Sequence, residues 1–428
     1  SVTPWIASTA VNGVPFPTNP LSNPFPTGIV EPMYRDQALI NVQGNGVGAA
    51  LSNFPPPYVQ QWNLDIQRQL PGNSLIDVSY AGSKGTHLPA HSQDLDQMPL
   101  KYLPQGGPSA ANNTIIANLT NSIANPFQGI VQSGGTGNNS TIPAGKLLLP
   151  YPQFDDVSME EPDNRDSIYH SLQAKFQKRF SAGASILASY TLSKLIDNTN
   201  SEINWLEAAS PQWGDSNAYN LRGERSLDGF DVPQRFVLSA VLDLPVGRGK
   251  KFGGSMGPVA DKVIGGWGID TVITLQRGFP ISMGCSGSDG LLGLSGIPNV
   301  GCPRLSVVGP RGNTSGSLDA KLNQWFNTSA YAITQNYGYG TDGRTEPNVR
   351  TDGIKNFDFA AFKNTKFGPD DRLALEFRAE FFNLFNRTQF SPPNTSCCTP
   401  VSQGGSFGEV TSQYNLPRVI QFGLRLSF

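Results

Sequence analysis

The sequence lacks several features that would assign it to a familiar class of protein. No run of about 18 or more apolar residues occurs, so the chain has no predicted transmembrane helix. Charged residues make up only 15% of the 428 residues and the formal net charge is -2, so neither nucleic-acid binding nor an acidic tail is indicated. The chain is therefore either soluble or a barrel that crosses a membrane with strands.

Cysteine and histidine are also scarce. The four cysteines lie in loop-like stretches, and their spacing matches no zinc motif. We expect loop disulfides in an oxidising compartment, and we favour Cys285–Cys302 because this pair closes the shortest loop of reasonable size. No nucleophile–base pair, phosphate loop or paired carboxylates are recognisable, so we predict no catalytic, cofactor-binding or metal site and no enzymatic activity.

The clearest positive signal is strict alternation of apolar and polar residues at 419–428 (VIQFGLRLSF). One face of this segment is wholly apolar and carries Ile420, Phe422, Leu424, Leu426 and Phe428. The opposite face carries Gln421, Gly423, Arg425 and Ser427. A period of two with one apolar face predicts a strand that contacts lipid on one side and water on the other.

The same alternation recurs along the chain and predicts about nine strands in total. The other eight centre on 58–70, 76–80, 167–180, 186–192, 236–244, 267–275, 356–366 and 372–382. Short connections at 71–73, 181–183 and 368–371 alternate with long ones, and the connection after 236–244 contains a predicted short helix near Val259–Ile264. Short turns on one side and long loops on the other are typical of outer-membrane barrels.

We therefore predict an all-β, antiparallel transmembrane barrel portion in the outer membrane. Residues 1–57 would form an extracellular loop segment and residues 58–428 the barrel part, with extracellular loops 84–166, 196–235, 277–355 and 387–416. Phe428 would then lie in the periplasm. Arg68 and Lys178 interrupt the apolar face, but both lie close to a short turn, where a cation can reach lipid headgroups at little cost.

Several stretches resemble a known family. YVQQWNLDIQRQL (58–70), DVSYAGSKGTHL (77–88), DVPQRFVLSAVLDLPVGR (231–248), WFNT (325–328) and FRAEFFNLFNRTQF (377–390) resemble the C-terminal barrel of TonB-dependent outer-membrane receptors. The nearest subgroup is the Oar-like receptors of acidobacterial type, which often carry a carboxypeptidase-regulatory-like domain. In the last strand, Gln421, Gly423, Leu426 and Phe428 resemble the signal that the barrel-assembly machinery reads.

The resemblance implies a receptor that binds a solute outside the cell and imports it with energy delivered through TonB. Such barrels have about 22 strands, so we expect this chain to be the C-terminal part of a longer receptor whose plug and TonB-binding box lie in an absent N-terminal part. Expected partners are outer-membrane lipid, the barrel-assembly machinery, TonB and an unknown solute, either carbohydrate or peptide, but no nucleic acid.

Aromatic loop residues are the candidate ligand contacts, with loop packing as the competing interpretation. They are Trp205, Trp213, Trp325, Tyr331, Tyr337 and Tyr339. An alternative function is that of a surface structural or adhesion protein that uses its large loops. A third possibility is a secreted soluble β protein that binds carbohydrate.

Overall fold

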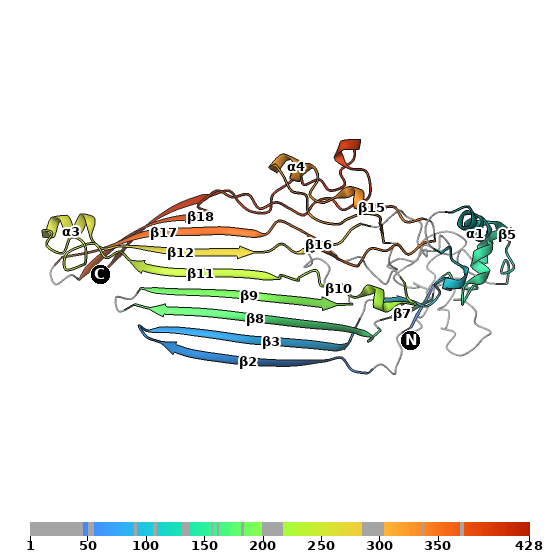
Figure 1. Cartoon of the computed structure of the whole chain (residues 1–428), viewed down its shortest axis with the longest axis horizontal. Helices are drawn as coiled ribbons and strands as arrows, with labels where there is room; N and C mark the ends of the chain where they lie inside the picture. Colours follow the sequence, from blue (N-terminus) through green and yellow to red (C-terminus); the bar gives the residue numbers. More distant parts are fainter. Residues whose placement is uncertain are drawn as a thin grey trace, which may run out of the picture.

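One large antiparallel sheet dominates the computed structural model of the chain (Figure 1). The structure describes residues 46–49, 55–89, 92–105, 109–130, 137–155, 157–160, 162–180, 184–198, 217–284, 304–335, 337–368 and 372–428. No helix within these ranges is long and apolar enough to cross a membrane.

Nine long strands follow one another in sequence order across the sheet, each antiparallel to its neighbours. They are β2 (Tyr58–Leu70), β3 (Ser74–Leu88), β8 (Arg165–Arg179), β9 (Ser185–Asp197), β11 (Gln234–Asp243), β12 (Trp267–Gln276), β17 (Ile354–Phe367), β18 (Leu373–Phe382) and β19 (Val419–Ser427). A short strand, β10 (Ser226–Leu227), pairs with β9 beside this series. The predicted all-β antiparallel fold is confirmed, and β3 extends four residues beyond the point where we expected its loop to begin.

The register places the apolar residues of neighbouring strands on one continuous face. Leu64 lies opposite Tyr80, Tyr80 opposite Leu172, and Leu172 opposite Leu192. On later strands of the same face, Tyr190 lies opposite Phe236 and Ala379 opposite Phe422. These side chains remain exposed; Leu64 is 65% and Leu424 71% accessible. An exposed apolar face that crosses nine strands is far larger than a soluble protein leaves open to water, and it suits contact with lipid.

The opposite face of the sheet is polar and carries an ion network. Arg378 of β18 donates from Nε to Glu380 at 2.8 Å and also pairs with Asp270 on β12. Glu376 lies on the other side of the same guanidinium, at 3.9 Å. Charged groups that neutralise one another are what a wet barrel interior accommodates, and they agree with the predicted polar face.

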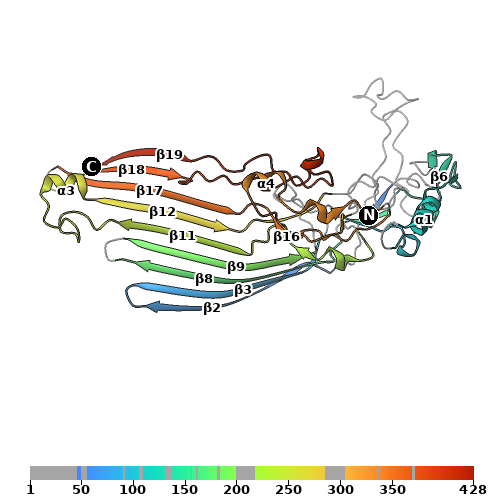
Figure 2. The same ribbon diagram turned by 45° about the horizontal axis from the view of Figure 1, so that its top comes forward.

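The short connections lie together at one end of the sheet, and the longer segments gather at the other end (Figures 1 and 2). The turn at 71–73 uses Gly72 and Asn73 at positive φ, which both residue types tolerate. The predicted short helix is confirmed as α3 (Pro258–Ile264), at the end with the short connections. The predicted turn at 181–183 lies outside the described residues, as do residues 369–371 of the turn predicted at 368–371.

The long connections, and the segment before β2, contain ordered elements that the sequence pattern did not reveal. They include β1 (Val47–Ala49), β4 (Ser92–Asp94), β7 (Val157–Glu160), α1 (Ala110–Thr120), β5 (Ser122–Ala124), β6 (Thr141–Pro143), β13 (Pro280–Ile281), β14 (Ser306–Val307), α4 (Leu318–Asn323), β15 (Tyr331–Ala332) and β16 (Glu346–Arg350). Two apolar clusters support them. One centres on Phe326 and Phe407, and the other on Met98 and Leu103.

Candidate functional site

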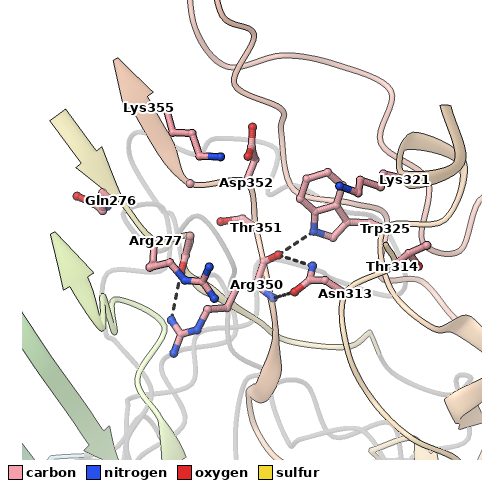
Figure 3. Close-up of a pocket in the computed structure, with 12 residues that line it drawn as sticks. Gln276, Arg277, Asn313, Thr314, Lys321, Trp325, Arg350, Thr351, Asp352 and Lys355 are labelled. Atoms are coloured by element: carbon pink, nitrogen blue, oxygen red, sulfur yellow. Dashed lines mark hydrogen bonds between the residues drawn. The ribbon is translucent and has the colours of Figure 1, made fainter. Parts of the chain in front are cut away.

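A pocket of about 270 Å³ lies where the sheet meets the folded long connections, and we call it the cationic pocket (Figure 3). The end of β12, the start of β17, the end of β16 and the segment around α4 all contribute to it. Its lining consists of Gln276, Arg277, Gly278, Asn313, Thr314, Lys321, Trp325, Arg350, Thr351, Asp352, Gly353 and Lys355.

Two glycines allow the backbone segments of this pocket to approach closely. A Cβ atom at Gly278 would lie 1.9 Å from the carbonyl oxygen of Thr351, and one at Gly353 would lie 2.2 Å from that of Gln276. Because both contacts are with backbone, no side-chain movement could relieve them. The two glycines therefore fix the position of the β16–β17 connection against the end of β12.

The Arg350 backbone anchors the opposite wall. Its carbonyl oxygen accepts hydrogen bonds from Trp325 Nε1 at 2.7 Å and from the Asn313 amide at 2.9 Å, while its N–H donates to Asn313 Oδ1 at 3.0 Å. Trp325 also packs edge-on against Phe390, with ring centroids 6.4 Å apart. The indole is thus held in one orientation before any ligand arrives.

The charge of the pocket is positive and largely uncompensated. Arg277, Lys321 and Lys355 form no ion pair with any residue in the described part of the chain, whereas the Arg350 guanidinium pairs with Asp231 at 2.6 Å. The one carboxylate in the lining, Asp352, already pairs with Arg387, which lies outside the lining, at 3.1 Å. Three cations therefore remain available to an incoming anion.

A second pocket, of about 570 Å³, lies beside the first and shares Arg350 with it. Its lining comes from the end of β9, from residues between 225 and 233 including β10, and from Pro347, Asn348 and Arg350, and it includes no aromatic side chain. The cationic pocket is the better candidate site, because it combines unpaired cations with a fixed aromatic ring.

Two buried ion pairs fasten the 304–350 segment to the sheet side of the molecule. Arg344 pairs with Asp197 at the end of β9, and Arg304 pairs with Glu224 in the connection between β9 and β11. All four side chains are almost fully buried. Sequence reasoning missed these pairs, because their partners are far apart in the chain.

The same segment also contains a pair of neighbouring acidic side chains, Asp342 and Glu346. Glu346 is fully buried beside Asp342, and Arg311 donates to its Oε1 at 3.1 Å. Burial, followed by the hydrogen bond and negative charge of Asp342, raises the pKa of Glu346 to about 8, although Arg311 opposes the shift. The Glu346 carboxyl is therefore mostly protonated near neutral pH.

The structure locates four of the six predicted aromatic contacts. Trp325 lines the cationic pocket, whereas Tyr331 belongs to the Phe326 cluster, and Tyr337 and Tyr339 belong to or pack on the Met98 cluster. For the three tyrosines these positions favour the packing interpretation, and ligand contact stays a prediction. Trp205 and Trp213 lie outside the described residues.

The remaining predicted residues are placed as follows. Gln421 and Gly423 lie on the polar face of β19, opposite Glu380 and Arg378, while Leu426 and Phe428 are exposed. Cys285 and Cys302 lie outside the described residues, so their pairing stays a prediction. The other two cysteines, Cys397 and Cys398, pack against the Phe326 cluster. Among the described residues, no group of three or more His, Cys, Asp or Glu side chains could hold a metal ion.

The fold and its exposed apolar face define a membrane β-barrel domain. The outer membrane beta barrel domain family matches residues 1–421, and the chain therefore belongs to that family. Comparison with curated proteins gives no match.

Solved structures give weaker similarities. The outer membrane transporter YddB from Escherichia coli is 9% identical with a TM-score of 0.36, over 90% of this chain and 34% of that chain. FpvA from P. aeruginosa, in an iron complex with a heterologous pyoverdine, is 8% identical with a TM-score of 0.33. The match covers 87% of this chain and 27% of that chain. The chain thus spans about a third of the length of the first protein and about a quarter of the second.

Proposed function

We propose that this chain is part of a TonB-dependent outer-membrane receptor, of the Oar-like subgroup, that binds a solute outside the cell and imports it. The observation that carries the proposal is the cationic pocket, which places unpaired cations and a fixed indole at the end of the sheet that bears the long connections. Membership of the outer membrane beta barrel domain family and the resemblance of five sequence stretches to TonB-dependent receptors support it.

In this proposal the long connections face the outside and the short turns, with Phe428, face the periplasm. Within the described residues the sheet ends in β2 and β19, which do not pair with each other. Unpaired strand edges in lipid cost several kcal/mol for each unsatisfied backbone group, so we propose that further strands complete the barrel. The barrel-assembly machinery and TonB would be the protein partners.

The solute that suits the cationic pocket is an acidic saccharide. The flat apolar face of Trp325 can pack against the C–H groups of a sugar ring. Arg277, Lys321 and Lys355 can bind a carboxylate with charge-assisted hydrogen bonds. Thr314 and Gln276 add neutral hydrogen-bonding groups for hydroxyls, and the volume of the pocket suits a ligand of one or two rings.

A binding measurement tests this proposal directly. Digalacturonate should bind the complete receptor purified in detergent, measured by calorimetry, whereas the neutral disaccharide lactose should not. Hydrogen bonds to charged groups contribute about 1.5–3 kcal/mol each. Lys321→Gln should therefore lower the affinity for digalacturonate at least about tenfold. Lys101→Gln, an exposed cation away from the pocket, is the matched control.

Equal binding of lactose and digalacturonate, or equal effects of the two substitutions, would contradict the assigned site. Uptake of labelled digalacturonate by cells that carry the receptor, and its loss when TonB is deleted, tests import separately from binding.

A surface structural or adhesion role is the second candidate. It is favoured by the long connections, which fold around two apolar clusters of their own and so present a large ordered surface. If the protein mediates adhesion, deletion of its gene should reduce attachment of cells to a surface while leaving solute uptake unchanged. The transport proposal expects the opposite result.

A further inference from the structure

The connection between β11 and β12 differs from the other connections at its end of the sheet. The turn between β2 and β3 is three residues long, whereas this connection, residues 244–266, contains α3; we call it the α3 hairpin. Its helix exposes apolar residues: Val259 is 79%, Val263 66% and Ile264 50% accessible. Exposure of an apolar helix face to water is unfavourable, and such a face usually marks a site of contact with a membrane or another molecule.

The exposed orientation is fixed by contacts on the other side of the helix. Asp261 accepts a hydrogen bond from the backbone N–H of Arg248 at 2.6 Å through its side chain, and one from Gly265 at 2.8 Å through its carbonyl oxygen. At Gly247, a Cβ atom would lie 2.8 Å from Asp261 Oδ1. The helix therefore turns Asp261 toward the hairpin and Val259 and Val263 away from it.

The exposed helix residues continue the lipid-facing surface of the sheet. Trp267, the first residue of β12, lies in the apolar phase and donates from Nε1 to the carbonyl oxygen of Val263 at 3.4 Å. Lys363 on the neighbouring strand lies 5.4 Å from the centre of the same indole. Tryptophan beside lysine is a common arrangement at the boundary between membrane and water.

The rest of the hairpin is strongly basic. Arg248, Lys250, Lys251 and Lys262 are exposed, and Asp261 is the only acidic residue between positions 244 and 266. The hairpin therefore carries four cations against one carboxylate, and that carboxylate accepts a hydrogen bond from the backbone N–H of Arg248. Lys251 also lies over the ring of exposed Phe252, at 5.5 Å.

We propose that the α3 hairpin lies in the headgroup layer of the membrane and binds anionic phospholipid. Val259, Val263 and Ile264 would enter the acyl boundary, and Lys250, Lys251 and Lys262 would contact phosphate groups. Lipid fits better than a protein partner, because the apolar patch is continuous with the face that already contacts lipid. The inference depends on the membrane assignment of the sheet and not on the proposed solute.

Lipid retention by the complete receptor, purified in detergent and measured by native mass spectrometry, tests the proposal. The chain should retain phosphatidylglycerol in preference to phosphatidylcholine. The triple variant Lys250→Gln, Lys251→Gln and Lys262→Gln removes three charges. Its affinity for phosphatidylglycerol should fall by about fivefold for each charge removed. The control removes three exposed cations from the other end of the molecule, by Lys101→Gln, Arg222→Gln and Arg225→Gln, and should leave retention unchanged.

A separate variant tests whether the apolar face of α3 enters the acyl boundary. Val263→Asp keeps all four cations but places a carboxylate in the acyl boundary, so it should weaken retention of both lipids. All substituted side chains are exposed, and the far-ultraviolet circular dichroism of each variant should match that of the parent chain.

Three results would overturn the proposal: no preference for phosphatidylglycerol, equal losses in the two triple variants, or full retention by Val263→Asp. Displacement of the lipid by glycerol phosphate, beyond the effect of equal ionic strength, would also contradict it, because it would indicate a site for free phosphate.

Discussion

Arg344 in the long connection before β17 forms a buried ion pair with Asp197, the last residue of β9, although the two are 147 positions apart in the chain. Both side chains are less than 5% accessible. Burial, together with the nearby charge of Arg165, lowers the pKa of Arg344 to about 10, so it remains a cation at neutral pH. The pair joins the segment that carries the cationic pocket to the end of the sheet.

Asp197→Asn should therefore release this segment. Removal of one partner leaves a buried charge without compensation, which typically costs about 3–5 kcal/mol. We expect faster proteolysis and faster amide hydrogen exchange within residues 304–350, with the nine long strands of the sheet unaffected. The double variant Asp197→Asn/Arg344→Met should recover much of the protection, whereas Asp243→Asn, an exposed carboxylate at the other end of the sheet, should change nothing. Equal protection in Asp197→Asn and the parent would show that the pair does not hold the segment.

Glu346 should make the stability of the same segment dependent on pH. Its folded-state pKa of about 8 lies above the ordinary value of 4.5, so the folded segment binds more protons than the unfolded one between these values. The stabilisation is complete below pH 4.5 and is lost as pH rises through 8, by at most about 1.4 kcal/mol per pH unit. Hydrogen exchange of residues 304–350, corrected for intrinsic rates, should accelerate accordingly. Glu346→Gln should flatten this profile; an unchanged slope would assign the dependence to another group.

Within the sheet, Gly82 of β3 provides the space over which Trp62 of β2 lies. A Cβ atom at Gly82 would come within 2.3 Å of the indole, so Gly82→Ala should force Trp62 out of position. Overpacking of this kind costs about 1–3 kcal/mol. We expect a lower unfolding temperature and a changed tryptophan emission spectrum. Gly82→Ala combined with Trp62→Leu should restore the unfolding temperature; a wild-type value for the single variant would show that Trp62 relaxes freely.

The strand series could be predicted from sequence because its cause is local. Residues such as Leu172 and Gln173 alternate with a period of two, and the lipid on one face favours that alternation along most of each strand. Even α3 was predictable, since Pro258 begins a short stretch bounded by glycines. Exact strand ends were not, because polar residues such as Lys84 and Thr86 suit a strand end and a loop equally well.

The cationic pocket was predictable only through Trp325. Its cations come from separate segments, and nothing in the sequence distinguishes Arg277 and Lys355 from other charged residues. What unites them is the register of β12 with β17 and the close approach at Gly278, both of which are long-range features. The sequence also does not separate aromatic residues that line a pocket from those that pack in a small local core. Tyr331 lies in a polar stretch but belongs to the Phe326 cluster.

The lipid-facing assignment can be tested at adjacent residues in the middle of β8. Leu172 lies on the apolar face and Gln173 on the polar face. A cation at the centre of a lipid-exposed face costs about 2–4 kcal/mol, so Leu172→Arg should lower the urea concentration at which the lipid-reconstituted protein unfolds. Gln173→Arg introduces the same charge one residue away and should have little effect. Equal destabilisation by both would indicate that the two faces share one environment.

Topology can be settled by labelling single introduced cysteines on intact cells. Ser315 is exposed beside the cationic pocket, and Ser255 is exposed in the α3 hairpin at the opposite end of the sheet. If the long connections face outward, a membrane-impermeant maleimide should label Ser315→Cys and not Ser255→Cys. Disruption of the outer membrane should then expose Ser255→Cys to the reagent, which shows that this site is reactive once reached. The parent chain, with its native cysteines, gives the background. Labelling of Ser255→Cys alone on intact cells would reverse the proposed orientation and would place the cationic pocket in the periplasm.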